Sequence, residues 1–175
     1  MDTIFLESAI KRLQEYKALG DKTLAQLTDA EMNYTPAAGC NSIAIIVRHL
    51  HGNMLSRWTN FLTEDGEKPW RNRDTEFEET VATKETLLSL WEKGWHVLLD
   101  TLNSLQPEDL SRTIYIRSQP LNVVDAIIRQ IAHYCGHVGQ MVYIGKMLKA
   151  TDWQSLSIPR GASETFNQKM QQGKA

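Results

Sequence analysis

The sequence predicts an all-α protein in which four long helices form a four-helix bundle. Three observations lead to this prediction. Apolar residues recur every three or four positions in four stretches, capping residues or proline bound these stretches, and nothing between them predicts a real sheet. Such helices bury their apolar faces most economically against one another. With 175 residues and 42% hydrophobic content, we expect residues 1–175 to form a single domain.

The first two helices are predicted on either side of a turn-rich segment. The first is one long helix that only Gly20 interrupts. Its apolar positions are Leu6, Ile10, Leu13, Tyr16, Leu24 and Leu27. Either Asn41 or Ser42 can cap the second helix, which we expect to run to about Leu62.

A long connection follows, from Thr63 to Glu79. It is charged, contains Gly66 and Pro69, and has no sustained apolar period. Structureless segments of this length are uncommon in compact domains and are often functional. We therefore interpret it as a lid or a crossover, with a solvated linker as the alternative.

The third and fourth helices are separated by a short segment that begins at Pro107. The third helix, with Trp91 and Trp95 as core residues, stops before this proline. Residues 113–116 can form a short extended piece, but we expect no real sheet. The fourth helix begins near Asn122 and continues through Leu148. Its apolar stripe comprises Val124, Ile127, Ile128, Ile131, Cys135, Val138 and Val142.

The segment after the fourth helix, residues 150–175, has little helical period. It nevertheless contains several apolar side chains, among them Trp153, Leu156, Ile158 and Phe166. We expect an ordered C-terminal strap packed on the bundle rather than a free tail.

Composition and charge exclude several classes of protein. The 19 basic and 21 acidic residues give a formal net charge of -2, so the balance predicts neither a nucleic-acid nor a membrane partner. Two cysteines, Cys40 and Cys135, fit a reducing compartment better than a disulfide scaffold. The N-terminus does not resemble a signal peptide, and the longest apolar run, Ile43–Val47, is too short to span a bilayer. We expect a cytoplasmic protein.

Two histidines on the fourth helix are the first indication of a functional site. His133 and His137 are four residues apart, so their rings project from one face, one turn apart. Both imidazoles can then reach a single zinc-like ion, at about 2.0–2.1 Å from each nitrogen. Isolated pairs of this kind are more often surface or packing residues, so a metal site needs a third ligand.

The second helix offers two candidates for that ligand, His49 and His51. Neither lies in the apolar stripe of the helix, and at about 100° per residue their rings point roughly 200° apart. Only one of them can join a given site. Asn53 and Arg57 follow His49 at intervals of four, which makes that edge unusually polar. The helical wheel does not decide between the two histidines.

The segments Ser42–Leu50 and His133–His137, taken together, resemble the DinB-like superfamily of metal-binding four-helix bundles. Four further motifs resemble one subfamily of unknown function within it. These are residues 65–69, 71–74, 137–140 and 156–161. The resemblance covers nearly the whole chain.

This resemblance implies that His49, His133 and His137 bind the metal. It also implies an up-down-down-up topology, with residues 63–79 as the long crossover between helices two and three, and a homodimer. Characterised members of the superfamily include thiol-dependent transferases and isomerases that use bacillithiol, mycothiol or glutathione. Many members have no known activity.

Three imidazoles and an open fourth position are the arrangement of catalytic zinc, and nickel, iron or copper are also compatible. We expect a divalent transition metal, zinc or nickel first. The leading hypothesis is a bacillithiol-type S-transferase that joins a low-molecular-weight thiol to a small-molecule electrophile. Arg57, Arg71 and Arg73 would bind the carboxylates of the thiol, with ordinary surface arginines as the alternative.

Two other hypotheses remain open. A metal-dependent hydrolase needs a carboxylate near the ion to take a proton from water. Asp125 lies off the face of the histidines, and Asp74 and Glu76 fall in the long connection, which the sequence does not place. The third hypothesis is a non-catalytic protein that holds metal for stability, sensing or partner binding. The sequence identifies no general acid or base and leaves open whether the protein is an enzyme.

Overall fold

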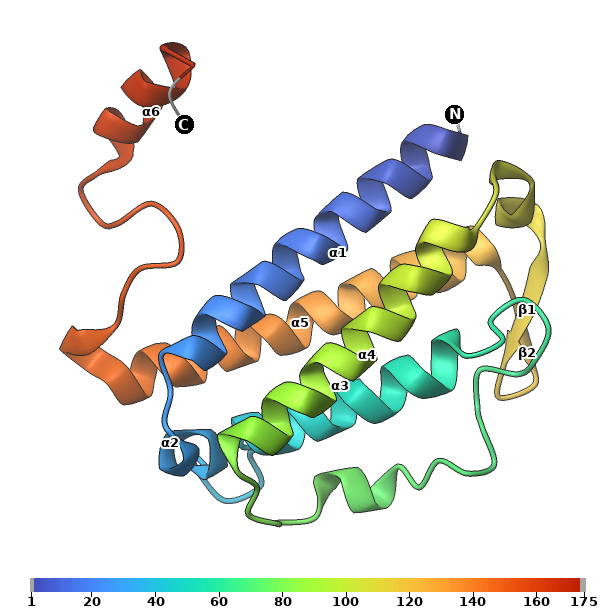
Figure 1. The fold of residues 1–175 in the computed structure, drawn as a ribbon, viewed down its shortest axis with the longest axis horizontal. Coiled ribbons are helices and arrows are strands. Elements are labelled where there is room, and N and C mark those ends of the chain that lie inside the picture. Colours follow the sequence, from blue (N-terminus) through green and yellow to red (C-terminus); the bar gives the residue numbers. More distant parts are fainter. Residues whose placement is uncertain (1, 174–175) are drawn as a thin grey trace.

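Within residues 2–173, which the computed structural model describes, the protein is mostly helical and contains one small antiparallel sheet (Figure 1). The α-helices are α1 (Asp2–Ala25), α2 (Asp29–Asn33), α3 (Ile43–Trp58), α4 (Lys84–Ser104), α5 (Val123–Lys149) and α6 (Ser163–Gln171). The strands are β1 (Thr113–Ile116) and β2 (Gln119–Asn122). Short 3-10 helices are η1 (Asp74–Phe77), η2 (Pro107–Ser111) and η3 (Ala150–Asp152).

The four long helices pack in two pairs. α1 lies along α5 and α3 lies along α4, while smaller contacts between α1 and α4 and between α3 and α5 join the pairs (Figure 1). Trp91 and Trp95 are buried in the core, as predicted. Gly20 permits the close approach of α1 and α4, because a Cβ there would clash with the ring of Trp91. None of the helices in residues 2–173 is long and apolar enough to cross a membrane.

The helix starts follow the predicted caps. Ser42, not Asn41, caps α3, with its hydroxyl accepting from the amide of Ile45 at 3.2 Å. Asn122 caps α5 in the same way. The predicted end of the second helix at Leu62 is wrong, because the helical backbone stops at Trp58 and Asn60 has a φ of 51°.

The prediction that the chain has no real sheet is also wrong. β1 pairs with β2 in register Ile114 to Leu121, and Ile116 to Gln119. The turn residues Arg117 and Ser118 both have positive φ, 55° and 59°, as a tight two-residue hairpin turn requires. Because this turn lacks the usual asparagine or glycine, the sequence gives no signal for it.

The connection between α3 and α4 is an ordered part of the fold. It contains η1, which packs on α3, and it buries the side chains of Lys68, Arg71 and Glu76. The alternative of a solvated linker is therefore wrong. The connection lies over the face of α3 that carries the polar residues described below.

The C-terminal segment contacts the helices only near its beginning. Trp153 packs beside Gly145, and Gln154 exchanges hydrogen bonds with Gln26. From residue 155 to 173 most side chains are exposed, and α6 stands away from the other helices (Figure 1). The expected strap is thus packed at its start and not along its length; residues 174–175 lie outside the described part.

Candidate metal centre

One edge of α3 carries a buried polar row, His49, Asn53 and Arg57. These residues are spaced by four, so they lie on one face of the helix, and only 4–6% of each is exposed. The face points towards α5, where His133 and His137 project one turn apart. Polar groups are seldom buried in such a row unless they are paired or bind something.

The structure brings His49, His133 and His137 together. One ring nitrogen of each lies within 4.8 Å of the others, and the ring centroids are 4.7–5.2 Å apart. Nε2 of His49 is 3.2 Å from Nε2 of His133. Two nitrogens bound to one zinc-like ion in tetrahedral geometry are separated by about 3.3 Å, given bonds of about 2.0–2.1 Å. The spacing fits a shared ion.

Hydrogen bonds to the opposite ring nitrogens orient two of these imidazoles. Nδ1 of His49 donates to Oε2 of Glu76 at 2.9 Å, and Nδ1 of His137 donates to Oε1 of Gln140 at 2.8 Å. With the proton held at Nδ1, the Nε2 lone pair is directed to the common centre. Metal-binding histidines usually have such a partner, which fixes the tautomer and raises the basicity of the ligand.

His51 does not belong to this cluster. Its Nδ1 donates to the carbonyl of Leu90 on α4 at 2.9 Å, so the ring faces α4 and not the histidines of α5. The choice between His49 and His51, which the helical wheel left open, is therefore decided in favour of His49.

Glu76 connects the histidines to the long connection. Burial alone would raise the pKa of its carboxyl, but hydrogen bonds from His49 and Arg71 outweigh this effect and lower it. Arg71 donates to both carboxylate oxygens, at 2.7 and 2.9 Å. Sequence reasoning named Glu76 only as an acid of unknown position, because the connection has no periodicity that would place it.

Burial also favours neutral imidazoles on α5. It is the largest cause of the low pKa of His133, which falls to about 3, and neighbouring positive groups lower it further. Burial lowers the pKa of His137 as well, although its bond to Gln140 acts in the opposite direction. Neutral imidazole is the form that binds a metal.

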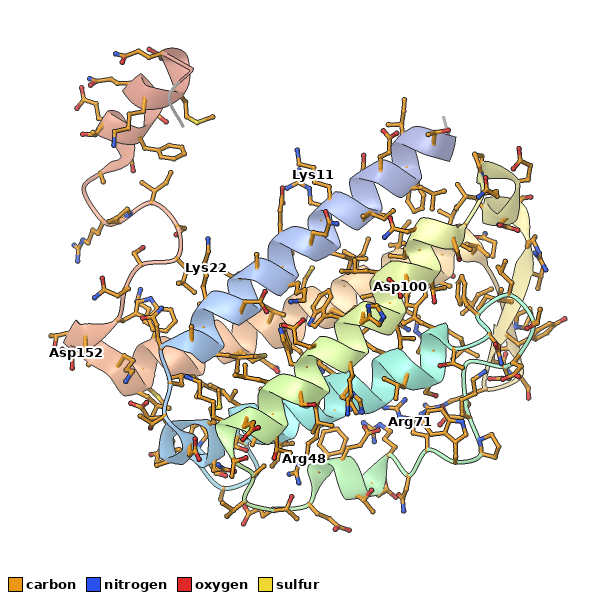
Figure 2. All side chains as sticks on the ribbon, viewed as in Figure 1. Lys11, Lys22, Arg48, Arg71, Asp100 and Asp152 are labelled. Atoms are coloured by element: carbon orange, nitrogen blue, oxygen red, sulfur yellow. The ribbon has the colours of Figure 1, made fainter. Side chains whose placement is uncertain are left out.

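The three arginines expected to bind substrate lie beside this cluster. Arg57 donates to the carbonyl of Gly66 and pairs with Glu67 at 3.2 Å. Arg71 pairs with Glu76 (Figure 2). The guanidinium carbon of Arg73 lies 4.8 Å from the centroid of the Phe77 ring. All three line a pocket that also includes His49 and His133. Their binding of a thiol remains a prediction.

The arrangement can hold one divalent transition-metal ion. Three imidazole nitrogens are a donor set that suits zinc, nickel, iron or copper, and the group of possible ligands found in residues 2–173 comprises these three histidines. Both oxygens of Glu76, the carboxylate that contacts His49, already accept hydrogen bonds. Glu76 is therefore placed as a partner of His49 and not as a further member of the cluster.

Comparison with known proteins gives a family without an assigned activity. A family model described as a protein of unknown function, DUF1572, matches residues 1–162. Among solved structures, the crystal structure of a conserved protein of a locus from Enterococcus faecalis is similar, with a TM-score of 0.61 and 20% identity. The match covers 81% of this chain and 95% of that chain, and at this identity it supports the fold alone. No curated protein matches.

Proposed function

Because this chain belongs to the DUF1572 family of proteins of unknown function, its activity has to be inferred from its site, and we propose a metal-dependent thiol transferase. The enzyme would join a low-molecular-weight thiol of the bacillithiol type to an electrophilic small molecule. The observation that carries this proposal is the cluster of His49, His133 and His137.

His49, His133 and His137 would hold a divalent ion, zinc or nickel in the first instance, and this ion would supply a Lewis acid that lowers the pKa of a thiol. The chain's own groups prepare the site. Glu76 and Gln140 hold protons at Nδ1 of His49 and His137, which keeps both Nε2 atoms free to bind. Arg57, Arg71 and Arg73 hold the carboxylates of the thiol.

The proposed reaction is a substitution. The sulfur of the thiol forms a bond to the electrophilic atom of the second substrate, and the leaving group departs with the electron pair of the broken bond. The proton of the thiol passes to solvent. No oxidant or reductant is consumed.

The surroundings of Glu76 make transfer a better proposal than hydrolysis. A hydrolase needs a base that can take a proton from water. Glu76 is the carboxylate that contacts the histidine cluster, and both of its oxygens already accept hydrogen bonds from His49 and Arg71. Its lowered pKa also makes it a weak base.

Metal content and thiol consumption together test the proposal. Elemental analysis of the purified protein should find one transition-metal ion per chain, and none in His133→Ala. The matched control is His96→Ala, because His96 is exposed and lies outside the cluster. Loaded wild type should consume bacillithiol, mycothiol or glutathione with 1-chloro-2,4-dinitrobenzene, whereas His133→Ala should not.

Two outcomes would contradict the transferase. Stoichiometric metal without consumption of any thiol would favour the hydrolase or the non-catalytic protein, and hydrolysis of a reporter ester would then separate these two. Equal metal content in wild type and His133→Ala would show that the histidine cluster is not the metal site.

We also propose an architecture and an assembly for this protein from its resemblance to the DinB-like superfamily. The four long helices would form a DinB-like up-down-down-up bundle, supported by the long segment that joins the neighbouring helices α3 and α4. The single domain would act in the cytoplasm as a homodimer on small molecules, without a nucleic-acid or membrane partner, in keeping with its small net charge.

A further inference from the structure

A small pocket beside the three histidines is lined by five arginines. It has a volume of about 190 Å³ and lies where α3, the long connection, the β-hairpin and α5 meet. The arginines are Arg57, Arg71, Arg73, Arg117 and Arg129. They come from four separate segments, so their convergence is a property of the fold and not of one charged stretch.

The pocket retains positive charge after its ion pairs are counted. Glu67 accepts from Arg57 at 3.2 Å and from Arg117 at 2.8 Å, and Glu76 pairs with Arg71. Asp65, which accepts the backbone amides of the hairpin turn, is also close enough to act on Arg57. Five guanidinium groups against these three carboxylates leave two positive charges.

Two of the arginines have no carboxylate partner. Among the side chains of residues 3–173, no carboxylate lies within ion-pair distance of Arg73 or Arg129, and both of these arginines are exposed while lining the pocket. An anion entering the pocket would therefore meet two free guanidinium groups. Forked guanidinium donors match the geometry of phosphate and carboxylate.

Buried polar atoms at the base of the pocket also lack partners. Nε of Arg57 and Nη1 of Arg71 have no hydrogen-bond acceptor, although these side chains are only 5% and 2% exposed. Oε1 of Gln130 is a buried acceptor without a donor, and it would accept a hydrogen bond from a hydroxyl of a ligand. Buried donors without acceptors are unfavourable, so a bound oxyanion would satisfy them.

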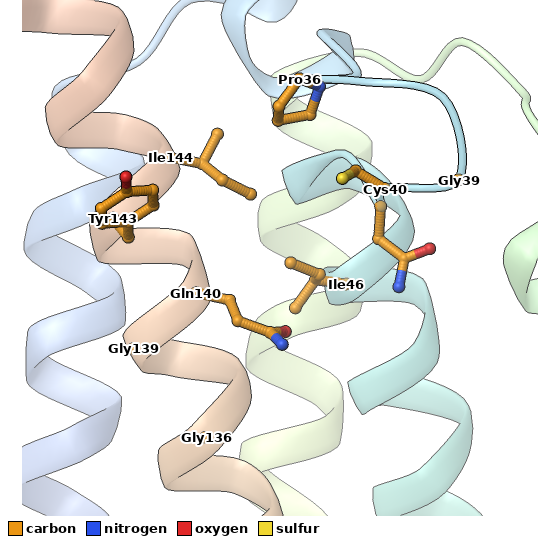
Figure 3. Close-up of a pocket in the computed structure, with 10 residues that line it drawn as sticks. Pro36, Gly39, Cys40, Ile46, Gly136, Gly139, Gln140, Tyr143 and Ile144 are labelled. Carbon is orange, nitrogen blue, oxygen red and sulfur yellow. The ribbon is translucent and has the colours of Figure 1, made fainter.

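The pocket on the other side of His137 has the opposite character. It has a volume of about 650 Å³ and lies between the loop that carries Cys40 and the glycines of α5 (Figure 3). None of the residues found to line it is charged, and a Cβ at Gly136 or Gly139 would meet no atom within 4 Å. Gln140, the partner of His137, forms part of its wall. The three histidines thus lie between an anion-attracting pocket and a neutral one.

We propose that the arginine pocket binds a doubly charged oxyanion, a phosphate or dicarboxylate group, which under the proposed function belongs to the thiol substrate. At about 30 Å³ for each water-sized group, it holds roughly six heavy atoms, which suits such a head group. The anionic end of the substrate lies at the arginines and its neutral part extends past the histidines. This orientation rests on the proposed function, whereas the binding of the anion does not.

Calorimetry with metal-free protein tests the site without any enzyme assay. Inorganic phosphate and malonate are titrated separately at constant ionic strength, because removal of metal prevents the anions from binding to an ion instead. We expect one site per chain. Tighter binding of phosphate would assign a phosphate ester as the substrate group, and tighter binding of malonate a dicarboxylate.

The decisive variants are Arg73→Ala and Arg129→Ala. Both residues are exposed and unpaired with carboxylates, so the fold should survive, which the thermal midpoint checks. Each variant should lower the affinity for the anion by roughly tenfold or more, since each removes a charged hydrogen-bond donor. Arg160→Ala, which changes an exposed arginine in the C-terminal segment, should leave the affinity unchanged.

Absence of saturable binding of both anions at millimolar concentration would overturn the proposal. So would equal weakening by Arg160→Ala and Arg129→Ala, because general electrostatic attraction would then explain the binding. Failure of the thiol-transfer assay would leave these results intact, since the titration measures neither turnover nor metal.

Discussion

The two sides of α3 are buried to a similar degree but are built differently. Towards α4 the contact is tight and mostly apolar, apart from hydrogen bonds such as that from His51 to the carbonyl of Leu90, and a Cβ at Gly94 would lie 3.1 Å from Sδ of Met54. Towards α5 the buried groups are polar: Asn53 accepts from the hydroxyl of Tyr134 at 2.9 Å, and His49 faces His133. One helix therefore contributes to a packed interface and to a polar one.

The difference indicates which interface serves stability and which serves binding. Buried polar groups add little net stability, because each hydrogen bond replaces one made with water, whereas unpaired ones cost free energy. Between α3 and α5 two buried polar atoms are unpaired, Nε of Arg57 and Oε1 of Gln130. An interface selected only for stability would replace them with apolar groups. Changes in the two interfaces should therefore have separable effects.

The largest effect on stability is expected in the apolar interior, from Trp95→Ala. Trp95 is fully buried and packs edge-on against Trp91, at 5.3 Å between ring centroids. Its Nε1 has no hydrogen-bond partner, so the loss comes from packing alone. We expect the free energy of unfolding in urea to fall by about 3–5 kcal/mol.

The matched control is Trp70→Ala, because Trp70 is 58% exposed and its removal should change stability by no more than about 0.5 kcal/mol. Metal bound per folded chain should be the same in both variants. A loss of metal in Trp95→Ala at temperatures where the chain is folded would show that the two interfaces are not separable.

A smaller effect, on metal rather than on folding, is expected from Glu76→Gln. The carboxylate orients His49 and increases the basicity of its Nε2. The amide of glutamine would orient the ring less firmly and increase the basicity of Nε2 less. We expect metal affinity, measured by competition with a chelator, to fall by about 10–100-fold. Glu79→Gln, an exposed carboxylate in the same connection, should leave it unchanged. Equal affinities in all three proteins would mean that Glu76 does not act on the site.

The helices could be predicted because their signals are local. Ser42 and Asn122 are capping residues within three positions of the amides they bind. The hairpin could not be predicted, because its unusual backbone depends on a distant residue. Asp65 accepts the amides of Arg117 and Ser118 at 2.8 and 2.7 Å, across more than fifty residues of sequence.

The site was predictable only in part for the same reason. Spacing alone paired His133 with His137, but the choice of His49 needed the family resemblance, since both histidines lie outside the apolar stripe. Periodicity also misjudged the face of α5: Ile128, expected in the stripe, is 51% exposed, whereas Tyr134 is fully buried. Hydrophobicity identifies apolar residues, but the packing of α1 and α3 around α5 decides which are covered.

The smallest effect is expected from the cap of the helix that carries two of the ligands. Asn122→Ala removes the acceptor of the Asp125 amide, a bond of 2.7 Å, and should lower stability by about 1 kcal/mol. Asn122→Asp, which keeps the acceptor, should restore it. His133 lies about three turns further along α5, so metal affinity should not change. If affinity falls together with stability, the end of the helix positions the ligands; if stability alone falls, the packing around His133 and the contact of Glu76 with His49 position them.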